Sequence, residues 1–246
     1  MDLDLADKVV VVSGGLRGIG AAIVATLQAE GARVATIDRE VGAIVVGDLT
    51  QPGFCAQAIH RIVEQFGRID GLVNNAGRND GVGLRSGTAE RFLESIRANL
   101  LHYYELAQAA LPHLLVTRGA ILNITSKVAE TGQGGTSGYA AANGGRNALT
   151  REWAVELAPL GVRVNAVVVA ECFTPMYAEW LAGLPNPEAT RARIESRIPL
   201  GGRMTTPQEI ARAAVFLLSP AASHITGQLL HVDGGYVHLD RAANAS

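Results

Sequence analysis

The chain has 246 residues, of which 48% are hydrophobic and 5% aromatic, and its formal net charge at pH 7 is −2. That length suits one large domain with a sizeable core, and a near-neutral charge without a basic stripe argues against nucleic acid as a partner. Because no apolar run approaches the roughly 20 residues that span a bilayer, no membrane partner is expected either.

The amino-terminal segment and the cysteines predict a cytoplasmic protein. The first residues, MDLDLADK, are acidic and lack the pattern of a signal peptide. Cys55 and Cys172 lie far apart, and in a large protein that is not secreted they predict free thiols rather than a disulfide. The six histidines are scattered along the chain, so no metal site is predicted.

The stretch VVVVSGGLRGIG at residues 9–20 predicts a buried strand followed by a glycine-rich turn. Gly14, Gly15, Gly18 and Gly20 fall within it, and a helical pattern follows at 21–30. Such a turn brings main-chain N–H groups and a helix N-terminus up to a phosphate, whereas side chains would block the approach. The alternative is a tight strand-to-helix turn that binds no ligand.

The second predicted strand, at 33–38, ends in Asp38. A carboxylate there suits the ribose hydroxyls of an adenosine and repels the additional phosphate of NADP, so the sequence favours NAD as the cofactor. Arg39 could partly offset this preference. The alternative for Asp38 is an ordinary acid at a strand end.

Strand and helix patterns alternate through the rest of the chain. Further strands are predicted at 43–49, 71–74, 119–125, 162–168 and 228–232, further helices at 54–66, 90–112, 139–158 and 207–218, and a less regular, proline-containing segment at 169–200. This alternation predicts an α/β fold, a Rossmann-like doubly wound parallel sheet of about seven strands with helices on both faces. No linker or repeat interrupts it, so we expect a single domain over residues 1–246.

The turn Ser13-Gly14-Gly15-Leu16-Arg17-Gly18-Ile19-Gly20 resembles the TGxxxGIG turn of the short-chain dehydrogenase/reductase family, with serine for threonine. Further motifs match in the family's order over about residues 5–239, namely Asp48-Leu49, Asn74-Asn75-Ala76-Gly77, Asn99, Ser126 and Tyr139. The resemblance implies a nicotinamide cofactor that is contacted by Gly14, Arg17, Gly18, Ile19, Gly20, Asp38, Asp48, Leu49, Asn75, Ala76, Gly77, Tyr139, Asn143 and Thr174.

The same resemblance implies that Tyr139 is the base that removes the substrate's hydroxyl proton, with Ser126 as donor to the substrate oxygen and Asn99 in support. A phenol with a pKa near 10 needs a nearby positive charge to act at neutral pH. The family supplies one from a lysine four residues after the tyrosine, where this chain has Asn143. Three outcomes stay open: the enzyme is slow, another group such as Lys127 compensates, or the substitution disables catalysis.

Residues 169–200 are expected to form a lid over the nicotinamide, as this region does in the family. Val169-Ala170 departs from the family's Pro-Gly, so we expect a slightly altered turn there. The stretch Thr174-Pro175-Met176-Tyr177, followed by Trp180-Leu181, resembles the L-fucose dehydrogenase branch of the family. That implies an aldose 1-dehydrogenase, which transfers a hydride from the anomeric carbon to NAD and yields a lactone.

The predicted substrate contacts are Ser126, Tyr139, Gln133, Glu171, Tyr177 and Trp180. A carboxylate, an amide and aromatic faces suit a sugar-like, polyhydroxylated small molecule better than a steroid or an acyl chain. One alternative is an oxidoreductase that acts on a keto-deoxy sugar acid or another secondary alcohol or ketone. Another, of a different class, is an NAD-binding scaffold with little or no turnover.

The helical patterns at 90–112 and 139–158 carry apolar residues on more than one face, and a single sheet cannot cover them all. Together with the family resemblance, this predicts a homotetramer. Residues 236–239 are expected to reach a neighbouring subunit.

Overall fold

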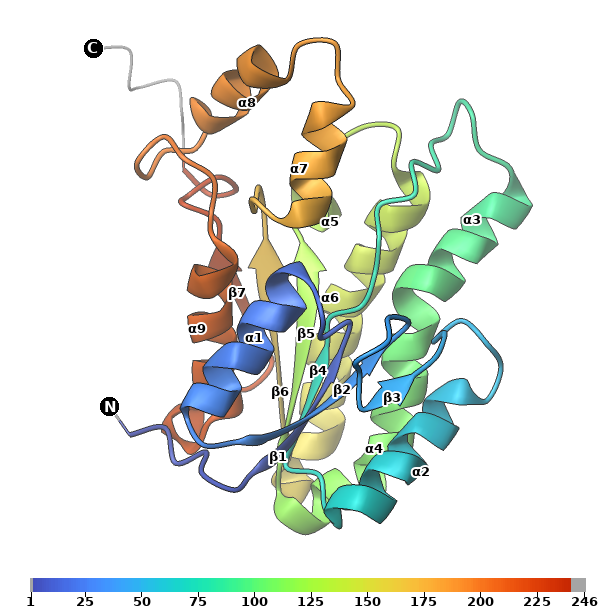
Figure 1. The fold of residues 1–246 in the computed structure, drawn as a ribbon, viewed down its shortest axis with the longest axis vertical. Helices are drawn as coiled ribbons and strands as arrows, with labels where there is room; N and C mark the ends of the chain where they lie inside the picture. Colours follow the sequence, from blue (N-terminus) through green and yellow to red (C-terminus); the bar gives the residue numbers. More distant parts are fainter. Residues whose placement is uncertain (1, 240–246) are drawn as a thin grey trace.

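The computed structural model describes residues 2–239 (Figure 1). Its centre is one sheet with the strand order β3-β2-β1-β4-β5-β6-β7, and every neighbouring pair is parallel. The strands are β1 Val9–Ser13, β2 Arg33–Asp38, β3 Val45–Val46, β4 Gly71–Asn74, β5 Ala120–Ser126, β6 Arg163–Val169 and β7 Leu229–Val232. The order reverses between β1 and β4, so the predicted doubly wound sheet is confirmed, with its switch point beside the glycine turn.

Helices cover both faces of the sheet (Figure 1). They are α1 Gly18–Ala29, α2 Phe54–Phe66, α3 Ala89–Ile96, α4 His102–Thr117, α5 Val128–Thr131, α6 Ser137–Leu157, α7 Pro175–Ala182, α8 Pro187–Glu195 and α9 Pro207–Leu218. Side chains alternate between the faces along each strand. Val10 and Val12 of β1 pack in one cluster with Ile23 and Leu27 of α1, whereas Val11 packs in the cluster that contains α2, α4 and α6.

The predicted third strand at 43–49 is too long, since only Val45–Val46 pairs with β2. The N–H of Ile44 donates to the Thr36 hydroxyl at 3.0 Å instead of to the main chain of β2. Gly47 turns beneath the ring of Phe54, where any Cβ would overlap the ring. The edge strand therefore ends where the first residue of α2 packs against it.

The helix predicted at 90–112 is wrong in its end and in its continuity. It runs on to Thr117 and widens into a π-helix over Arg97–Leu101. Pro112 lies inside α4, although a proline inside a helix typically costs about 3 kcal/mol. Leu106 and Leu114, on either side of it, are fully buried, so packing of the helix on the sheet outweighs that cost.

The less regular segment at 169–200 contains α7 and α8, each of which begins on a proline. Proline is favoured at the first helical position because its missing N–H has no partner there anyway. In Figure 1 both helices lie beyond the arrowheads of β5 and β6, at the carboxyl ends of the strands. The other predicted element bounds lie within three residues of the observed ones.

Buried amides lock α4 and α6 onto the middle of the sheet. Asn74 donates to the side chain of Asn123 at 3.1 Å, and Asn123 donates to the Thr150 hydroxyl at 2.9 Å. The Tyr103 hydroxyl donates to the Ile124 carbonyl at 3.0 Å. Because buried polar groups need partners of fixed geometry, these bonds set how the two helices sit on β4 and β5.

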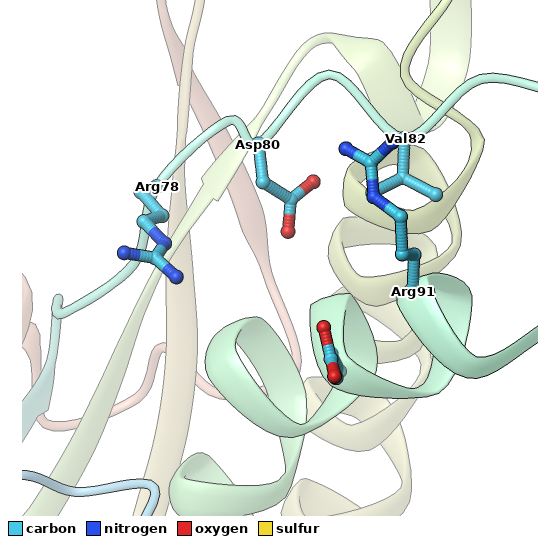
Figure 2. Close-up of a pocket in the computed structure, with 5 residues that line it drawn as sticks. Arg78, Asp80, Val82 and Arg91 are labelled. Atoms are coloured by element: carbon cyan, nitrogen blue, oxygen red, sulfur yellow. The ribbon is translucent and has the colours of Figure 1, made fainter. Parts of the chain in front are cut away.

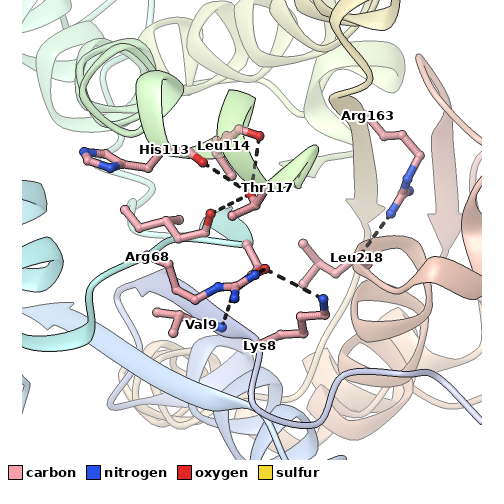
Figure 3. Close-up of polar contacts among 10 residues, drawn as sticks. Lys8, Val9, Arg68, His113, Leu114, Thr117, Arg163 and Leu218 are labelled. Carbon is pink, nitrogen blue, oxygen red and sulfur yellow. Dashed lines mark hydrogen bonds and ion pairs between the residues drawn. The ribbon is translucent and has the colours of Figure 1, made fainter.

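Polar contacts of a different kind close the amino edge of the sheet (Figure 3). The Asp70 carboxylate accepts from the Val9 N–H at 2.9 Å and pairs with Arg68 and, at 3.9 Å, with Lys8. Arg163 donates to the carbonyl of Leu218 at 2.9 Å. A hollow of about 960 Å³ lies among these residues, at the opposite edge from the glycine turn.

Cys55 and Cys172 are both free, as predicted, and both are buried. Burial raises the pKa of each thiol to about 12, so neither is a reactive thiolate. Among the helices of residues 2–239, none combines the length and the apolarity that crossing a membrane requires.

His102, in α4, is almost fully buried, and its Nδ1 has no partner among the described residues. Burial, followed by the charge of Arg146, lowers the pKa of this imidazole to about 4 from 6.5. The folded protein therefore keeps His102 neutral in a pH range where the unfolded chain protonates it.

We predict that mild acid destabilises the fold through His102. The stability that its low pKa contributes is present above pH 6.5 and is lost as the pH falls toward 4. Denaturant unfolding at pH 7 and pH 5 measures this for the wild type and for His102→Gln. Between pH 7 and pH 5, the free energy of unfolding should fall by roughly 1–2 kcal/mol more in the wild type than in His102→Gln. An equal fall in both proteins would contradict the prediction.

Candidate active site

In the glycine turn after β1, the main chain packs closely against itself and against the main chain of Ala76. Gly14 and Gly18 have left-handed φ values of 64° and 54°. A Cβ on Gly20 would overlap the carbonyl oxygen of Gly14, and one on Gly14 would lie 3.1 Å from the Cα of Ala76. Only glycine fits these positions, so no side chain stands at Gly14, Gly18 or Gly20, next to the start of α1.

Ser13 joins this turn to the segment after β4. Its hydroxyl accepts from the N–H groups of Asn75 and Ala76 at 3.0 and 3.2 Å. The Asn75 amide donates in return to the carbonyls of Ser13 and Gly14, both at 3.0 Å. The predicted cofactor residues of the two strands thus form one hydrogen-bonded unit.

Asp38 lies beside the turn, as the sequence predicts. Its carboxylate accepts from the N–H of Leu16, inside the turn, at 3.1 Å and from the N–H of Glu40 at 3.3 Å. Arg17 pairs with Glu40 at 3.1 Å in an exposed ion pair, which contributes little to stability. The guanidinium of Arg17 therefore lies at the rim of the turn.

Asp48 follows β3 and accepts from the N–H and the hydroxyl of Thr50 at 2.9 and 2.8 Å. Burial raises its pKa, but these hydrogen bonds and the charges of Arg39 and Arg78 outweigh burial, so the pKa lies below its usual value. Leu49 is buried with the α2 cluster, and Ile19 packs at the edge of the α1 cluster.

Thr174 lies against the other side of the turn, where a Cβ on Gly18 would come within 3.4 Å of its methyl group. Its hydroxyl accepts from the N–H of Tyr177 at 3.2 Å and caps α7. A nicotinamide dinucleotide fits these surroundings, because the glycine main chain and the N-terminus of α1 suit a pyrophosphate and Asp38 suits a ribose.

Ser126 ends β5, and Tyr139 lies in the first turn of α6, which packs on β5 and β6. Both side chains are half-buried. The Ser126 hydroxyl accepts from the N–H of Val128 at 3.5 Å, and no hydrogen bond joins it directly to Tyr139 within residues 2–239. The two predicted catalytic residues thus belong to neighbouring elements of the sheet's carboxyl edge.

Asn143 is fully buried, and both polar atoms of its amide have protein partners. Its Nδ2 donates to the Tyr139 carbonyl at 2.8 Å, and its Oδ1 accepts from Arg146 at 3.0 Å. Asn99 lies within the π-helix. The Asn99 carbonyl accepts from Nε of Arg146 at 2.6 Å.

Arg146 is a residue of this site that the sequence reading missed. It is 3% exposed and contacts both Asn99 and Asn143. The signal was available, because seven residues are close to two full helical turns, so Arg146 shares a helix face with Tyr139. A charged residue on that buried face marks a position whose role is not packing alone.

Three of the four predicted lid and loop contacts come together around Lys127. Its ammonium pairs with Glu171, the Tyr177 hydroxyl donates to Glu171 at 2.6 Å, and the Trp180 ring lies 5.2 Å from that of Tyr177. Burial, then the hydrogen bond to Glu171, raises the pKa of Tyr177. Tyr236, which belongs to the segment expected to reach a neighbouring subunit, lies with its ring centroid 4.0 Å from the ammonium.

Gln133 is the exception among these contacts. It is exposed in a loop whose neighbours Gly132 and Gly134 have left-handed φ values. No hydrogen bond ties its amide to the rest of the chain over residues 2–239.

Figure 2 shows a small pocket of about 270 Å³ next to the 75–77 segment, lined by Arg78, Asp80, Val82, Arg91 and Glu94. The Asp80 side chain points between the two arginines. Its charged lining and its small volume do not suit a dinucleotide, so we do not identify this pocket with the cofactor site.

Glu130, His231 and His238 come together although they are far apart in the sequence, with one ligand atom of each within 4.8 Å of the others. Spacing along the chain could not reveal this cluster. The carboxylate of Glu130 already has a partner on each oxygen, Asn147 at 3.3 Å and His231 at 3.0 Å. These contacts satisfy the carboxylate without an ion, and that no metal is used stays a prediction.

Comparison with known proteins identifies the family. The family model described as enoyl-(acyl carrier protein) reductase matches residues 14–237. The L-fucose dehydrogenase of Rattus norvegicus is 39% identical over 241 residues, which cover 93% of this chain and 88% of the rat protein. The chain belongs to the short-chain dehydrogenase/reductase family.

Solved structures agree with this short-chain dehydrogenase/reductase assignment. The Cj0485 dehydrogenase has a TM-score of 0.97 and 41% identity, and it and this chain cover each other fully. The ligand-free aldohexose dehydrogenase of Thermoplasma acidophilum has a TM-score of 0.92 and 32% identity, again with full coverage of both chains. This short-chain dehydrogenase/reductase is therefore an oxidoreductase that depends on a nicotinamide cofactor.

Proposed function

We propose that the protein oxidises a free aldose of the L-fucose kind at its anomeric carbon, with NAD as the hydride acceptor and a lactone as the product. The observation that carries this proposal is the similarity to L-fucose dehydrogenase over 93% of the chain. The likeness to an aldohexose dehydrogenase structure also supports a sugar substrate. Lys127, Glu171 and Tyr177 support a hydroxyl-rich substrate, because together they offer a cation, a carboxylate and a phenol.

Tyr139 is the proposed base. It takes the proton of the anomeric hydroxyl while Ser126 donates a hydrogen bond to the same oxygen and stabilises its developing charge. A bound nicotinamide supplies the acceptor for the hydride that leaves the anomeric carbon. Residues 169–200 act as a lid that excludes water, with Glu171, Tyr177, Trp180 and Gln133 contacting the sugar hydroxyls.

Asn143 is expected to lower the rate of turnover. A lysine at this position would carry a positive charge one helical turn from the phenol, whereas asparagine is neutral. We therefore infer that turnover is lower than a lysine at position 143 would allow, while cofactor binding, which depends on the glycine turn and Asp38, is largely retained.

We predict that NAD-dependent oxidation of L-fucose requires Tyr139. Tyr139→Phe should lower kcat by roughly 100-fold or more, because general base catalysis of this kind contributes about 10²–10⁴-fold. Tyr104→Phe, on the exposed outer side of α4, is the matched control and should retain kcat. NADH formation measured on a panel of aldoses, keto-deoxy sugar acids and secondary alcohols identifies the substrate class.

Activity on the sugar acids or the secondary alcohols alone would favour the alternative oxidoreductase function. NADH binding without turnover on any member of the panel would mean that the protein is a nucleotide-binding scaffold.

We predict that NADH binds at least tenfold more tightly than NADPH, because the Asp38 carboxylate beside the turn repels an additional phosphate. Tenfold corresponds to about 1.4 kcal/mol, a modest value for such a repulsion. Fluorescence titration gives both dissociation constants. Asp38→Asn should narrow the ratio, and Glu30→Gln, the same charge change at the far end of α1, should not. Equal or tighter NADPH binding by the wild type would refute the preference.

We predict a homotetramer formed through the outer helices. Leu93 of α3, Val116 of α4 and Val155 of α6 are 65%, 85% and 77% exposed, and burial between subunits would remove this apolar surface from water. Light scattering should give four times the chain mass of 25.8 kDa. Val155→Glu should lower that mass, whereas Val41→Glu, at an exposed turn, should not. A monomer mass at micromolar concentration would overturn the proposal.

The two free, buried cysteines suit the reducing cytoplasm, and we infer that the protein acts there.

A further inference from the structure

The guanidinium of Arg146 is the buried positive charge on the helix face that carries Tyr139. Tyr139, Asn143 and Arg146 follow one another at spacings of four and three residues, so their side chains stack along one side of α6. Side chains of a helix lean toward its N-terminus. The long Arg146 side chain therefore brings its charge back toward the level of Asn143.

The contacts of Arg146 fix this position. Its Nε donates to the Asn99 carbonyl at 2.6 Å, and its Nη1 donates to the Ile124 carbonyl at 3.2 Å and to Oδ1 of Asn143 at 3.0 Å. Its plane also lies over the Tyr103 ring, 4.1 Å from the centroid. Elements from three parts of the chain thus hold the guanidinium.

One end of the guanidinium has no hydrogen-bond partner among residues 2–239. Nη2 is buried without a hydrogen bond in the described part of the chain. It lies beneath the 75–77 segment, where a Cβ on Gly77 would come within 2.8 Å of it. An unpartnered, fully buried donor is costly, and its retention indicates that it serves the site rather than the packing.

No carboxylate within residues 2–239 neutralises this charge, since all its hydrogen-bond acceptors are neutral oxygens. The two lysines of the sequence are engaged elsewhere. Lys127 pairs with Glu171, and Lys8 lies at the amino edge beside Asp70. Arg146 is therefore a buried cation on the Tyr139 face whose charge is available to the site.

The field of this cation already acts on neighbouring groups. Burial raises the pKa of Tyr103 to about 12, while the charge of Arg146 opposes that rise and the charge of Tyr139 adds to it. His102 experiences the same charge, which lowers its pKa further than burial alone. Both Arg146 and Tyr139 thus lie within electrostatic range of Tyr103.

We propose that Arg146 is the positioning residue that supplies the positive charge for the ionisation of Tyr139, while its hydrogen bond fixes Asn143, whose amide donates to the Tyr139 main-chain carbonyl. This inference rests on the proposed role of Tyr139 as the base. The charge is two helical turns from Tyr139 instead of one, so Arg146 replaces part of what a lysine at position 143 would supply.

Other charged groups surround the same face, and any pH dependence includes their effects. The elements that pack on α6 carry Glu90, Arg91 and Glu94 on α3, Arg97 on the π-helix, and Lys127 and Glu130 at α5. His102 and Tyr103 of α4 lie near Arg146 itself. These groups are the same in every variant below, so differences between variants report Arg146.

The experiment titrates Tyr139 directly. Tyrosinate absorbance is recorded against pH for the folded protein and for its Tyr139→Phe counterpart, and the difference isolates Tyr139. In the Arg146→Gln background the midpoint should rise by roughly one pH unit, the low end of the range for a nearby charge. Arg146→Lys should shift it less. Arg163→Gln, which removes a guanidinium bonded to carbonyls at the amino edge, should leave it unchanged.

Turnover provides the second readout. Arg146→Gln should lower kcat at pH 7 about tenfold and move the ascending limb of the pH profile, which follows the ionisation of Tyr139, to higher pH by about one unit. Adding Asn143→Lys should restore more activity in the Arg146→Gln protein than in the wild type, because in the wild type a cation is already present. If Arg146→Gln does not fold by circular dichroism, Arg146→Met, which keeps the apolar stem, takes its place.

An unchanged Tyr139 midpoint in the folded Arg146 variant, or equal gains from Asn143→Lys in both backgrounds, would overturn the inference. The titration needs neither sugar nor cofactor. Failure of sugar oxidation would therefore refute the proposed function and leave the midpoint shift intact.

Discussion

The carboxyl edge of the sheet depends on one close approach, in which Gly14, Gly20 and Asn75 fill a space that has no room for a Cβ. The Asn75 amide holds the turn by donating to two of its carbonyls, and the Ser13 hydroxyl accepts from the Asn75 N–H. β1 and β4 are neighbours at the point where the strand order reverses, so this contact fixes both strand ends against α1. The predicted nucleotide site is thus built from main chain that cannot shift without breaking the turn.

A buried charge organises the other half of the site. The π-helix brings the Asn99 carbonyl to Arg146, and Arg146 in turn holds the amide of Asn143 below Tyr139. The hydrogen bonds from Asn74 to Asn123 and from Asn123 to Thr150 hold α6, the helix that carries Tyr139 and Arg146, on the sheet. Asn143 is neutral, so the cation on the helix face of Tyr139 is the buried guanidinium of Arg146, which is hydrogen-bonded to Asn143.

The parts of the fold that depend on local geometry were predictable from the sequence. The glycine turn follows from a backbone conformation that glycine favours, and the bounds of β2 and α2 follow from the strand and helix patterns of their own residues. The short β3 and the continuation of α4 through Pro112 were not, because they depend on the ring of Phe54 and on burial along α4. The contacts of Arg146 with Asn99 and of Lys127 with Glu171 join residues 47 and 44 positions apart, so no local pattern reveals them.

In the proposed reaction a hydride leaves the anomeric carbon of a sugar while Tyr139 removes the hydroxyl proton. The most direct measurement is mass spectrometry of the NADH formed from L-fucose that carries deuterium at the anomeric carbon. Each NADH should carry one deuterium, and Tyr139→Phe should form far less labelled NADH in the same time. NADH without label, with the deuterium retained in the sugar product or lost to water, would contradict the proposed reaction.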